Sequence, residues 1–132
     1  MNHKIDKKRK RGAMLTERYV VTVFGINTQY YTDEFIAYLW EESADEEYNK
    51  SSIYVTALID ARTLVCGKNR GCDLGDTAYV ISCLRNPVDN PDSDDYWNAF
   101  RRIILSIRVK LDNPAMTVTI QNADYYFFLK ES

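Results

Sequence analysis

The alternation of hydrophobic and polar positions predicts four β-strands in this chain. Residues 18–26 are rich in β-branched and aromatic side chains, and residues 77–85 have a similar composition. In residues 51–62, apolar side chains occur at every second position, which is the two-residue period of a strand. Residues 116–121 alternate in the same way, so we expect a strand over each of the four segments.

Two other segments have the three-and-four spacing of apolar residues that is typical of amphipathic helices. The first covers residues 32–49, where Thr32 is a suitable N-cap. The second begins near Asp92 or Ser93 and ends before Pro114, because the residue that precedes a proline rarely continues a helix. We therefore expect one helix after the first strand and one before the fourth.

The order of these elements predicts the fold. A turn at residues 122–124 precedes an apolar segment at 125–129, which we interpret as a fifth strand paired with the fourth. The order is then β-α-β-β-α-β with an added C-terminal strand, which is the order of the split β-α-β, or ferredoxin-like, sandwich. We expect residues 14–132 to form a single α+β domain of this class, with two helices on one face of an antiparallel sheet.

The N-terminal residues differ from the rest in charge. Residues 1–13 carry six Lys and Arg against one Asp, a net charge of +5, so the remaining body carries −7 of the overall −2. These residues have no apolar period, and we expect a disordered basic arm or a leader. The sequence shows neither a secretory signal nor an apolar run of about 20 residues, so the expected location is the cytoplasm.

Histidine and cysteine are too few and too widely spaced for the common catalytic and metal sites. The one histidine, His3, lies in the basic arm, so the body lacks the base of serine or cysteine hydrolysis. Cys66, Cys72 and Cys83 lack the paired spacing of structural zinc sites. We expect no metal, no cofactor and no catalytic residue. We also expect free thiols, with a Cys66–Cys72 disulfide as the less favoured alternative.

A glycine-containing loop at residues 66–73, CGKNRGCD, is a candidate anion site. Its glycines allow the backbone to approach a ligand closely, and Lys68 and Arg70 supply positive charge. The loop lacks the spacing of a P-loop, so it predicts no particular nucleotide chemistry. A module that binds a small anion or a phosphate ligand is therefore one alternative function.

A second alternative follows from the topology, which is also that of the RNA-recognition motif. The chain resembles that family in fragments, at Val23, Phe24 and Asn27 on the first strand and at residues 78–80 on the third. The resemblance implies a module that binds single-stranded nucleic acid. A body charge of −7 opposes contact with phosphates, so we rank this alternative second.

The leading hypothesis depends on carboxylates that the first helix itself does not explain. Asp33 and Glu34 stabilise its positive N-terminus, whereas the later carboxylates lie near its negative end and repel one another at a spacing of four. In the expected fold the helices run antiparallel, so this end lies beside the acidic start of the second helix. The expected acidic pole consists of Glu41, Glu42, Asp45, Glu46, Glu47, Asp89, Asp92, Asp94 and Asp95.

A surface whose charges are all negative steers and orients a positively charged partner. We therefore expect a small non-enzymatic interaction protein that binds a basic protein surface, such as that of a nucleic-acid-binding protein, through its acidic pole. A nucleic-acid-mimicking inhibitor of phage or mobile-element type has these features. Direct binding of nucleic acid is less favoured, no membrane contact is expected, and a homo-oligomer is compatible with an open sheet face.

Overall fold

The computed structural model describes residues 13–131, and the expected basic arm lies outside this range except for Ala13. The described chain runs through four strands, two long helices and one short 3-10 helix. The elements are β1 (Met14–Phe24), α2 (Asp33–Ser51), β2 (Leu58–Thr63), η1 (Lys68–Arg70), β3 (Thr77–Leu84), α3 (Ser93–Lys110) and β4 (Met116–Tyr125).

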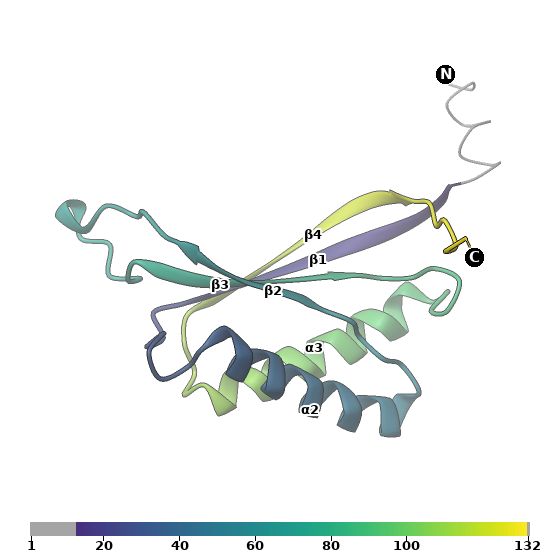
Figure 1. The fold of residues 1–132 in the computed structure, drawn as a ribbon, viewed down its shortest axis with the longest axis horizontal. Coiled ribbons are helices and arrows are strands. Elements are labelled where there is room, and N and C mark those ends of the chain that lie inside the picture. The colour runs from purple at the N-terminus through teal and green to yellow at the C-terminus, as the bar shows by residue number, and fades with distance from the viewer. Residues whose placement is uncertain (1–12, 132) are drawn as a thin grey trace, which may run out of the picture.

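The strands form one antiparallel sheet in the order β2-β3-β1-β4. Both helices lie on the same face of this sheet, and the two ends of the described chain lie at the same end of the molecule (Figure 1). This arrangement confirms the expected α+β, ferredoxin-like fold. No helix within residues 13–131 is long and apolar enough to cross a membrane.

The core lies between the sheet and the helices. The central strands alternate, so that one side chain in two points toward the helices and is buried. Each helix supplies an apolar stripe to the same layer. The fully buried side chains of this core include Val21, Val23, Ile36, Ile81, Phe100, Ile103 and Ile107.

The helix N-termini are fixed by the caps that the sequence predicts. The Thr32 hydroxyl oxygen accepts a hydrogen bond from the Phe35 backbone N–H at 3.1 Å. Asp92 Oδ1 accepts from the backbone N–H of Asp94 at 2.9 Å and of Asp95 at 3.1 Å. These bonds satisfy backbone donors that have no partner inside the helix, and they set where each helix begins.

The expected fifth strand is wrong. Residues 122–124 form no turn, because β4 continues to Tyr125 and pairs with β1 from Val23↔Met116 to Met14↔Tyr125. The predicted turn residues therefore pair with residues 15–17, a segment that precedes the strand expected from the sequence. Long-range pairing outweighs the local turn preference of Asn122 and Asp124.

The second strand is shorter than expected. The side-chain alternation predicted over residues 51–62 is present from residue 53 to residue 60, where Val55 is buried while Tyr54 and Thr56 are exposed, and it stops there because Ala61 is exposed. Pairing with β3 nevertheless begins only at Leu58, and Ser51 is the last residue of α2. Residues 53–57 are thus extended chain outside the sheet.

The expectation of free thiols is wrong for two of the three cysteines. Cys66 and Cys72 form a disulfide with a Cα–Cα distance of 5.7 Å, and it closes the loop that carries η1 at the end of the β2–β3 hairpin. Gly67 and Gly71 adopt positive φ values on either side of η1, which turns the chain so that the two cysteines meet. Cys83 is free and buried, as a small core residue.

Candidate functional site

A hollow lies between α2 and the segment that leads into β2. It has a volume of about 540 Å³, within the range of about 300–1,000 Å³ that is usual for small-molecule sites. We call it the acidic groove. It is lined by Glu34, Ala37, Tyr38, Trp40, Glu41, Tyr54, Thr56, Ala57 and Ile59.

The helix side of the acidic groove follows from residue spacing. Glu34, Tyr38 and Glu41 are four and three residues apart, so they project from the same edge of α2. Trp40 lies beneath them, where its Nε1 donates to the Val55 carbonyl oxygen at 2.9 Å. This bond holds the extended segment against the helix, and it leaves Tyr54 and Thr56 on the open side.

The electrostatics of the acidic groove are set by unpaired carboxylates. Within residues 13–131 neither Glu34 nor Glu41 takes part in an ion pair. Burial raises the pKa of Tyr54, and the negative charges of Asp45 and Glu41 raise it further. The Tyr54 hydroxyl therefore stays protonated at neutral pH and can donate a hydrogen bond.

A second hollow adjoins the first. It has a volume of about 390 Å³ and lies between the end of α2, the extended segment and the loop after β3. We call it the polar pocket, and it shares Tyr54 and Thr56 with the acidic groove. Its lining is Tyr48, Ser52, Tyr54, Thr56, Leu84, Asn86, Asp89, Asn90 and Tyr96.

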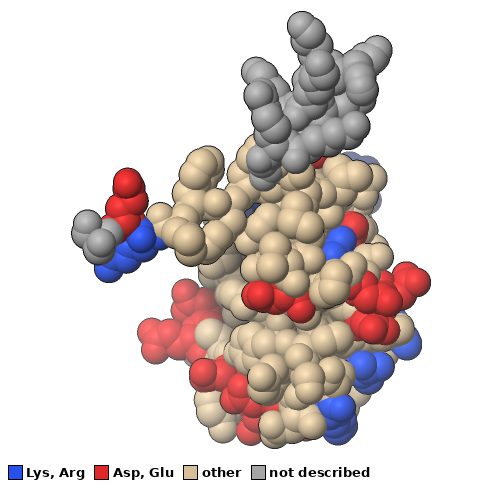
Figure 2. All heavy atoms as spheres, turned by 90° about the vertical axis from the view of Figure 1, so that its right-hand side faces the viewer, with Lys and Arg blue, Asp and Glu red and all other residues tan. Residues whose placement is uncertain are grey.

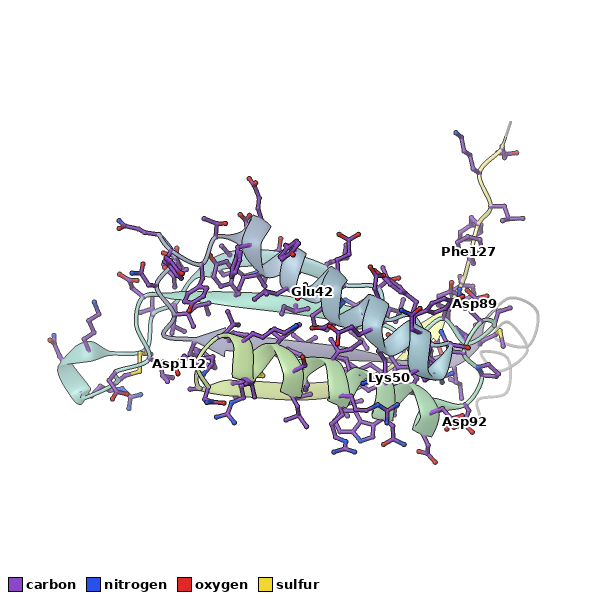
Figure 3. All side chains as sticks on the ribbon, turned by 90° about the horizontal axis from the view of Figure 1, so that it is seen from below. Glu42, Lys50, Asp89, Asp92, Asp112 and Phe127 are labelled. Atoms are coloured by element: carbon purple, nitrogen blue, oxygen red, sulfur yellow. A yellow bond between two sulfur atoms is a disulfide. The ribbon has the colours of Figure 1, made fainter. Side chains whose placement is uncertain are left out.

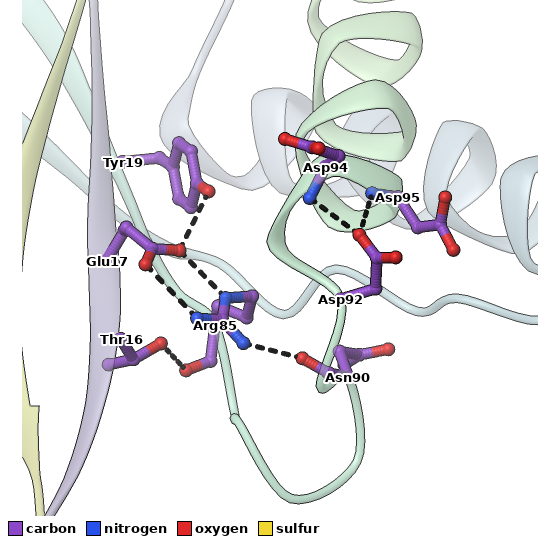
Figure 4. A network of polar contacts seen from close by, with 8 residues as sticks. All are labelled: Thr16, Glu17, Tyr19, Arg85, Asn90, Asp92, Asp94 and Asp95. Atoms are coloured by element: carbon purple, nitrogen blue, oxygen red, sulfur yellow. Dashed lines mark hydrogen bonds and ion pairs between the residues drawn. The ribbon is translucent and has the colours of Figure 1, made fainter.

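The loop wall of the polar pocket is held by Arg85 (Figure 4). Its guanidinium donates to Glu17 through Nε at 2.8 Å and Nη2 at 3.1 Å, and Nη1 donates to the Asn90 carbonyl at 2.7 Å. The hydrogen bonds from Arg85 to the Glu17 carboxylate hold the pKa of Glu17 below its ordinary value. The loop after β3 is thereby tied to β1, which gives the pocket a fixed wall.

The carboxylates expected on α2 have different surroundings. Glu41 lines the acidic groove, and Asp45 and Glu46 are exposed. Glu42 accepts from Lys110 Nζ at 3.1 Å, while Glu47 is buried in an ion pair with Arg102. Two of the five charges are therefore neutralised by α3. In Figure 3, Glu42 lies part-way along α2.

The carboxylates expected before α3 are mostly explained by local structure. Asp92 is the N-cap, and Asp94 and Asp95 lie in the first turn, where they stabilise the positive helix end. Asp89 lines the polar pocket and accepts from Asn86 Nδ2 at 3.2 Å. Asp89 and Asp92 lie at the end of the molecule where α2 finishes (Figure 3).

The carboxylates of α2 extend from its middle, where Glu42 bonds to Lys110 at the last residue of α3, toward the end of the molecule that holds Asp89 and Asp92. That end is not uniformly negative. Figure 2 shows this end, with the carboxylates in separate groups and Lys and Arg side chains nearby. Part of the negative charge of α2 is also neutralised, because Glu47 pairs with Arg102 and, nearer the middle of the helix, Glu42 pairs with Lys110. Contact of the nine predicted carboxylates with a partner stays a prediction.

The expected anion-binding residues lie apart from both hollows. Lys68 and Arg70 belong to η1, at the tip of the β2–β3 hairpin, which projects away from the helices (Figure 1). Lys68 lines a separate hollow of about 300 Å³ there, together with the disulfide residue Cys66. Anion binding at this tip stays a prediction.

The residues that the sequence reasoning missed are Glu34, Tyr38, Tyr54 and Thr56. The sequence holds a partial signal for the first two, because a carboxylate and a tyrosine four apart on a helix share one edge. It holds no signal that this edge meets residues 54–56, since that contact depends on how the chain returns along α2. Glu34 was instead explained by the helix N-terminus alone.

A family model described as SAM lyase matches residues 14–129. Two solved structures of phage SAM lyase share the fold. One, in complex with S-methyl-5′-thioadenosine, is 13% identical, with 88% of this chain and 93% of that chain covered and a TM-score of 0.54. The other, in the apo state, is 12% identical, with coverages of 91% and 94% and a TM-score of 0.52. None of the curated proteins matches this chain.

The family match overturns the functional expectation. A non-enzymatic interaction protein, and with it a nucleic-acid-mimicking inhibitor, is wrong, because the matching family is one of lyases. The sequence argument looked for a histidine base, a reactive cysteine or a metal site. Chemistry that needs none of these leaves no such motif, and the absence of one therefore did not exclude an enzyme.

Proposed function

Because the chain belongs to the SAM lyase family, we propose that it cleaves S-adenosylmethionine in the hollow formed by the acidic groove and the polar pocket. The two parts meet at Tyr54 and Thr56, so one elongated substrate reaches both. The cytoplasm is the expected location of the reaction.

The observation that carries the proposal is the combination of tyrosines and unpaired carboxylates in the acidic groove. S-adenosylmethionine carries positive charge on its sulfonium sulfur and on its amino group. An aromatic face attracts a cation within about 6 Å of the ring centroid, and a carboxylate accepts charge-assisted hydrogen bonds from an ammonium. Tyr38 and Tyr54 supply the rings, while Glu34 and Glu41 supply the carboxylates.

The reaction breaks the bond between the sulfur and Cγ of the methionine part, and the bonding electron pair stays on sulfur. The adenosine-containing product is then S-methyl-5′-thioadenosine, the ligand named for one phage lyase. The carbon fragment is completed without water by one of two routes. Its own carboxylate oxygen bonds to Cγ and closes a ring, or Cβ loses a proton to a groove carboxylate and an alkene forms.

Charge also favours release of the product. The substrate sulfur is cationic and the product sulfur is neutral, so the attraction that Tyr38, Tyr54 and the two glutamates exert on the sulfur is lost when the bond breaks. The product S-methyl-5′-thioadenosine also lacks the charged α-amino group of the methionine part. The acidic groove therefore discriminates between substrate and product.

The test is to incubate the purified full-length chain with S-adenosylmethionine and to separate the products by liquid chromatography. We expect S-methyl-5′-thioadenosine, together with an amino-acid fragment whose mass is one water less than that of homoserine. Formation of homoserine itself as the initial product would indicate hydrolysis and contradict the lyase reaction. Absence of S-methyl-5′-thioadenosine, from protein shown to be folded by its thermal melt, would contradict the proposal as a whole.

A further inference from the structure

The β2–β3 hairpin ends in a loop that the rest of the molecule does not hold. Pairing of the two strands ends where the Leu64 N–H donates to the Asp76 carbonyl at 2.8 Å. Residues 65–75 continue beyond this point and extend past the ends of the helices (Figure 1). Within residues 13–131, every hydrogen bond of residues 66–72 has its partner inside the hairpin. The loop therefore keeps its shape through its own contacts.

Lys68 and Arg70 lie at the tip of this loop, and both are exposed. Exposed loop tips with small or polar residues are the preferred sites of proteolytic cleavage. The other basic residues between positions 13 and 129 lie in strands or long helices, apart from Arg85, which is buried. Those in strands and helices are Arg18, Lys50, Arg62, Arg101, Arg102, Arg108 and Lys110. A protease that cuts after basic residues thus meets its most accessible peptide bonds in this body at the hairpin tip.

The Cys66–Cys72 disulfide protects these peptide bonds in the oxidised chain. It holds the two Cα atoms 5.7 Å apart. Six residues of extended chain span about 20 Å, so the closed loop is far from extended. A protease binds the residues around the cut bond as an extended strand. The closed loop therefore fits such an active site poorly.

Once the disulfide is reduced, little keeps the loop closed. The Gly67 carbonyl accepts from the Arg70 and Cys72 N–H groups at 3.0 and 3.2 Å. The Lys68 carbonyl accepts from the Gly71 N–H at 3.0 Å. These bonds lie at the exposed tip, where water replaces them at small cost. Reduction therefore allows the tip to open while the sheet stays paired.

A cut at the tip divides the chain into two parts that remain interleaved. The first part contains β1, α2 and β2, and the second contains β3, α3 and β4. Because the sheet order is β2-β3-β1-β4, every ladder of the described sheet joins a strand of one part to a strand of the other. The ion pair of Glu47 with Arg102 joins the helices of the two parts as well. The cut chain therefore keeps the contacts of its fold.

We propose that the hairpin tip is a reduction-gated processing site, where an endoprotease specific for basic residues cuts after Lys68 or Arg70. A dithiol first gives two electrons and two protons to the disulfide and is itself oxidised to a disulfide, which leaves thiols at Cys66 and Cys72. Water then hydrolyses the peptide bond, leaving a carboxylate on the basic residue and an amino group on the residue that follows. The product is a two-chain protein held together by its sheet.

The test compares the oxidised full-length wild type with the Cys66→Ser, Cys72→Ser double variant, using trypsin as the protease. No reductant is present, so trypsin keeps its own disulfides. Mass spectrometry identifies cuts after Lys68 or Arg70, and cuts near either end of the chain, which only shorten it, are counted separately. We expect the tip of the double variant to be cut about tenfold faster than that of the wild type.

Reduced wild type provides a second comparison that does not depend on how the double variant folds. It is treated with dithiothreitol, separated from the reagent and then exposed to trypsin, and it should be cut as fast as the double variant. The matched control adds Lys68→Gln and Arg70→Gln to the double variant, which should abolish cutting at the tip. Size-exclusion chromatography of the cut double variant should show both parts eluting together, at the volume of the uncut chain.

Three results would overturn the inference. Equal cutting of oxidised and reduced wild type would show that the disulfide gives no protection. An earlier cut inside a strand or a long helix would show that the tip is not the preferred site. Separation of the two parts on the column would show that the sheet does not hold the cut chain together. None of these measurements requires turnover of S-adenosylmethionine, so this inference and the proposed function stand or fall separately.

Discussion

Glu47 of α2 and Arg102 of α3 form a bidentate ion pair that joins the two helices. Arg102 Nε donates to Glu47 Oε1 at 2.9 Å, and Nη2 donates to Oε2 at 2.8 Å. The Glu47 side chain is 5% exposed, whereas that of Arg102 is 49% exposed. The Glu47 carboxylate is therefore the desolvated group of the pair, and it depends on Arg102 for its hydrogen bonds.

Removing Arg102 should destabilise the fold more than its exposure suggests. Arg102→Ala leaves the buried Glu47 carboxylate without its two donors, and we expect the free energy of unfolding to fall by about 1–3 kcal/mol. Urea denaturation followed by circular dichroism measures this change. The control is Arg101→Ala, at the exposed neighbouring position, which should cost less than about 0.5 kcal/mol. Equal effects of the two substitutions would contradict the role of the pair.

The same pair should make stability depend on acid pH. Hydrogen bonds from Arg102 lower the pKa of Glu47 from its ordinary value of 4.5, and those from Arg85 do the same for Glu17. The unfolded chain then binds more protons than the folded chain in acid. This contribution to stability is present above pH 4.5 and is lost as the pH falls through the lower, folded-state pKa values.

Denaturation curves between pH 7 and pH 2 would test this dependence. We expect the stability difference between the wild type and Arg102→Ala to be full at neutral pH and to shrink below about pH 4.5, because protonated Glu47 no longer gains from the arginine. A difference that stays constant throughout this range would show that Arg102 stabilises the fold by packing rather than by charge.

The fold was predictable because its determinants are local. The Thr32 and Asp92 caps and the apolar spacing of α3 place both helices within a few residues of their observed ends. The end of β4 was not predictable, since Asn122 and Asp124 become strand residues only through pairing with Glu17 and Leu15, which lie at the other end of the chain.

The candidate site was less predictable than the fold. Tyr54 and Thr56 lie on the polar side of an alternating segment, and that alternation continues unchanged where the segment leaves the sheet. The two-residue alternation of buried and exposed side chains therefore does not reveal where the backbone pairing with β3 stops. The acidic groove likewise requires that Glu34 and Glu41 face this segment, which is a property of the packed helix and not of its sequence.

The disulfide at the hairpin tip should affect stability without affecting the site. Cys66 and Cys72 are six residues apart, and closing so short a loop contributes about 2 kcal/mol in the chain-entropy description. We expect a Cys66→Ser, Cys72→Ser double variant to lose that amount in urea denaturation and to keep its turnover of S-adenosylmethionine. Dithiothreitol should lower the stability of the wild type by a similar amount and leave the double variant unchanged. A large loss of turnover would instead connect the hairpin tip to the site.

The carboxylates of the acidic groove should determine substrate affinity. Glu34→Gln and Glu41→Gln keep the shape of each side chain and remove its charge, so the attraction to the cationic methionine part is lost. Because both side chains lie at an open surface, we expect the low end of the effect of a charge-assisted hydrogen bond, an increase of about tenfold in KM for S-adenosylmethionine. Initial rates of S-methyl-5′-thioadenosine formation measure it, and thermal melts should be unchanged.

The matched control is Glu46→Gln, which removes the same charge from the same helix at an exposed position outside the groove. Its KM should change less than twofold, because a charge that does not contact the substrate acts only through screened, long-range attraction. Added salt should raise the wild-type KM and bring it closer to that of the two groove variants. Equal KM increases in all three variants would show that net charge, and not contact in the groove, attracts the substrate, and would remove Glu34 and Glu41 from the site.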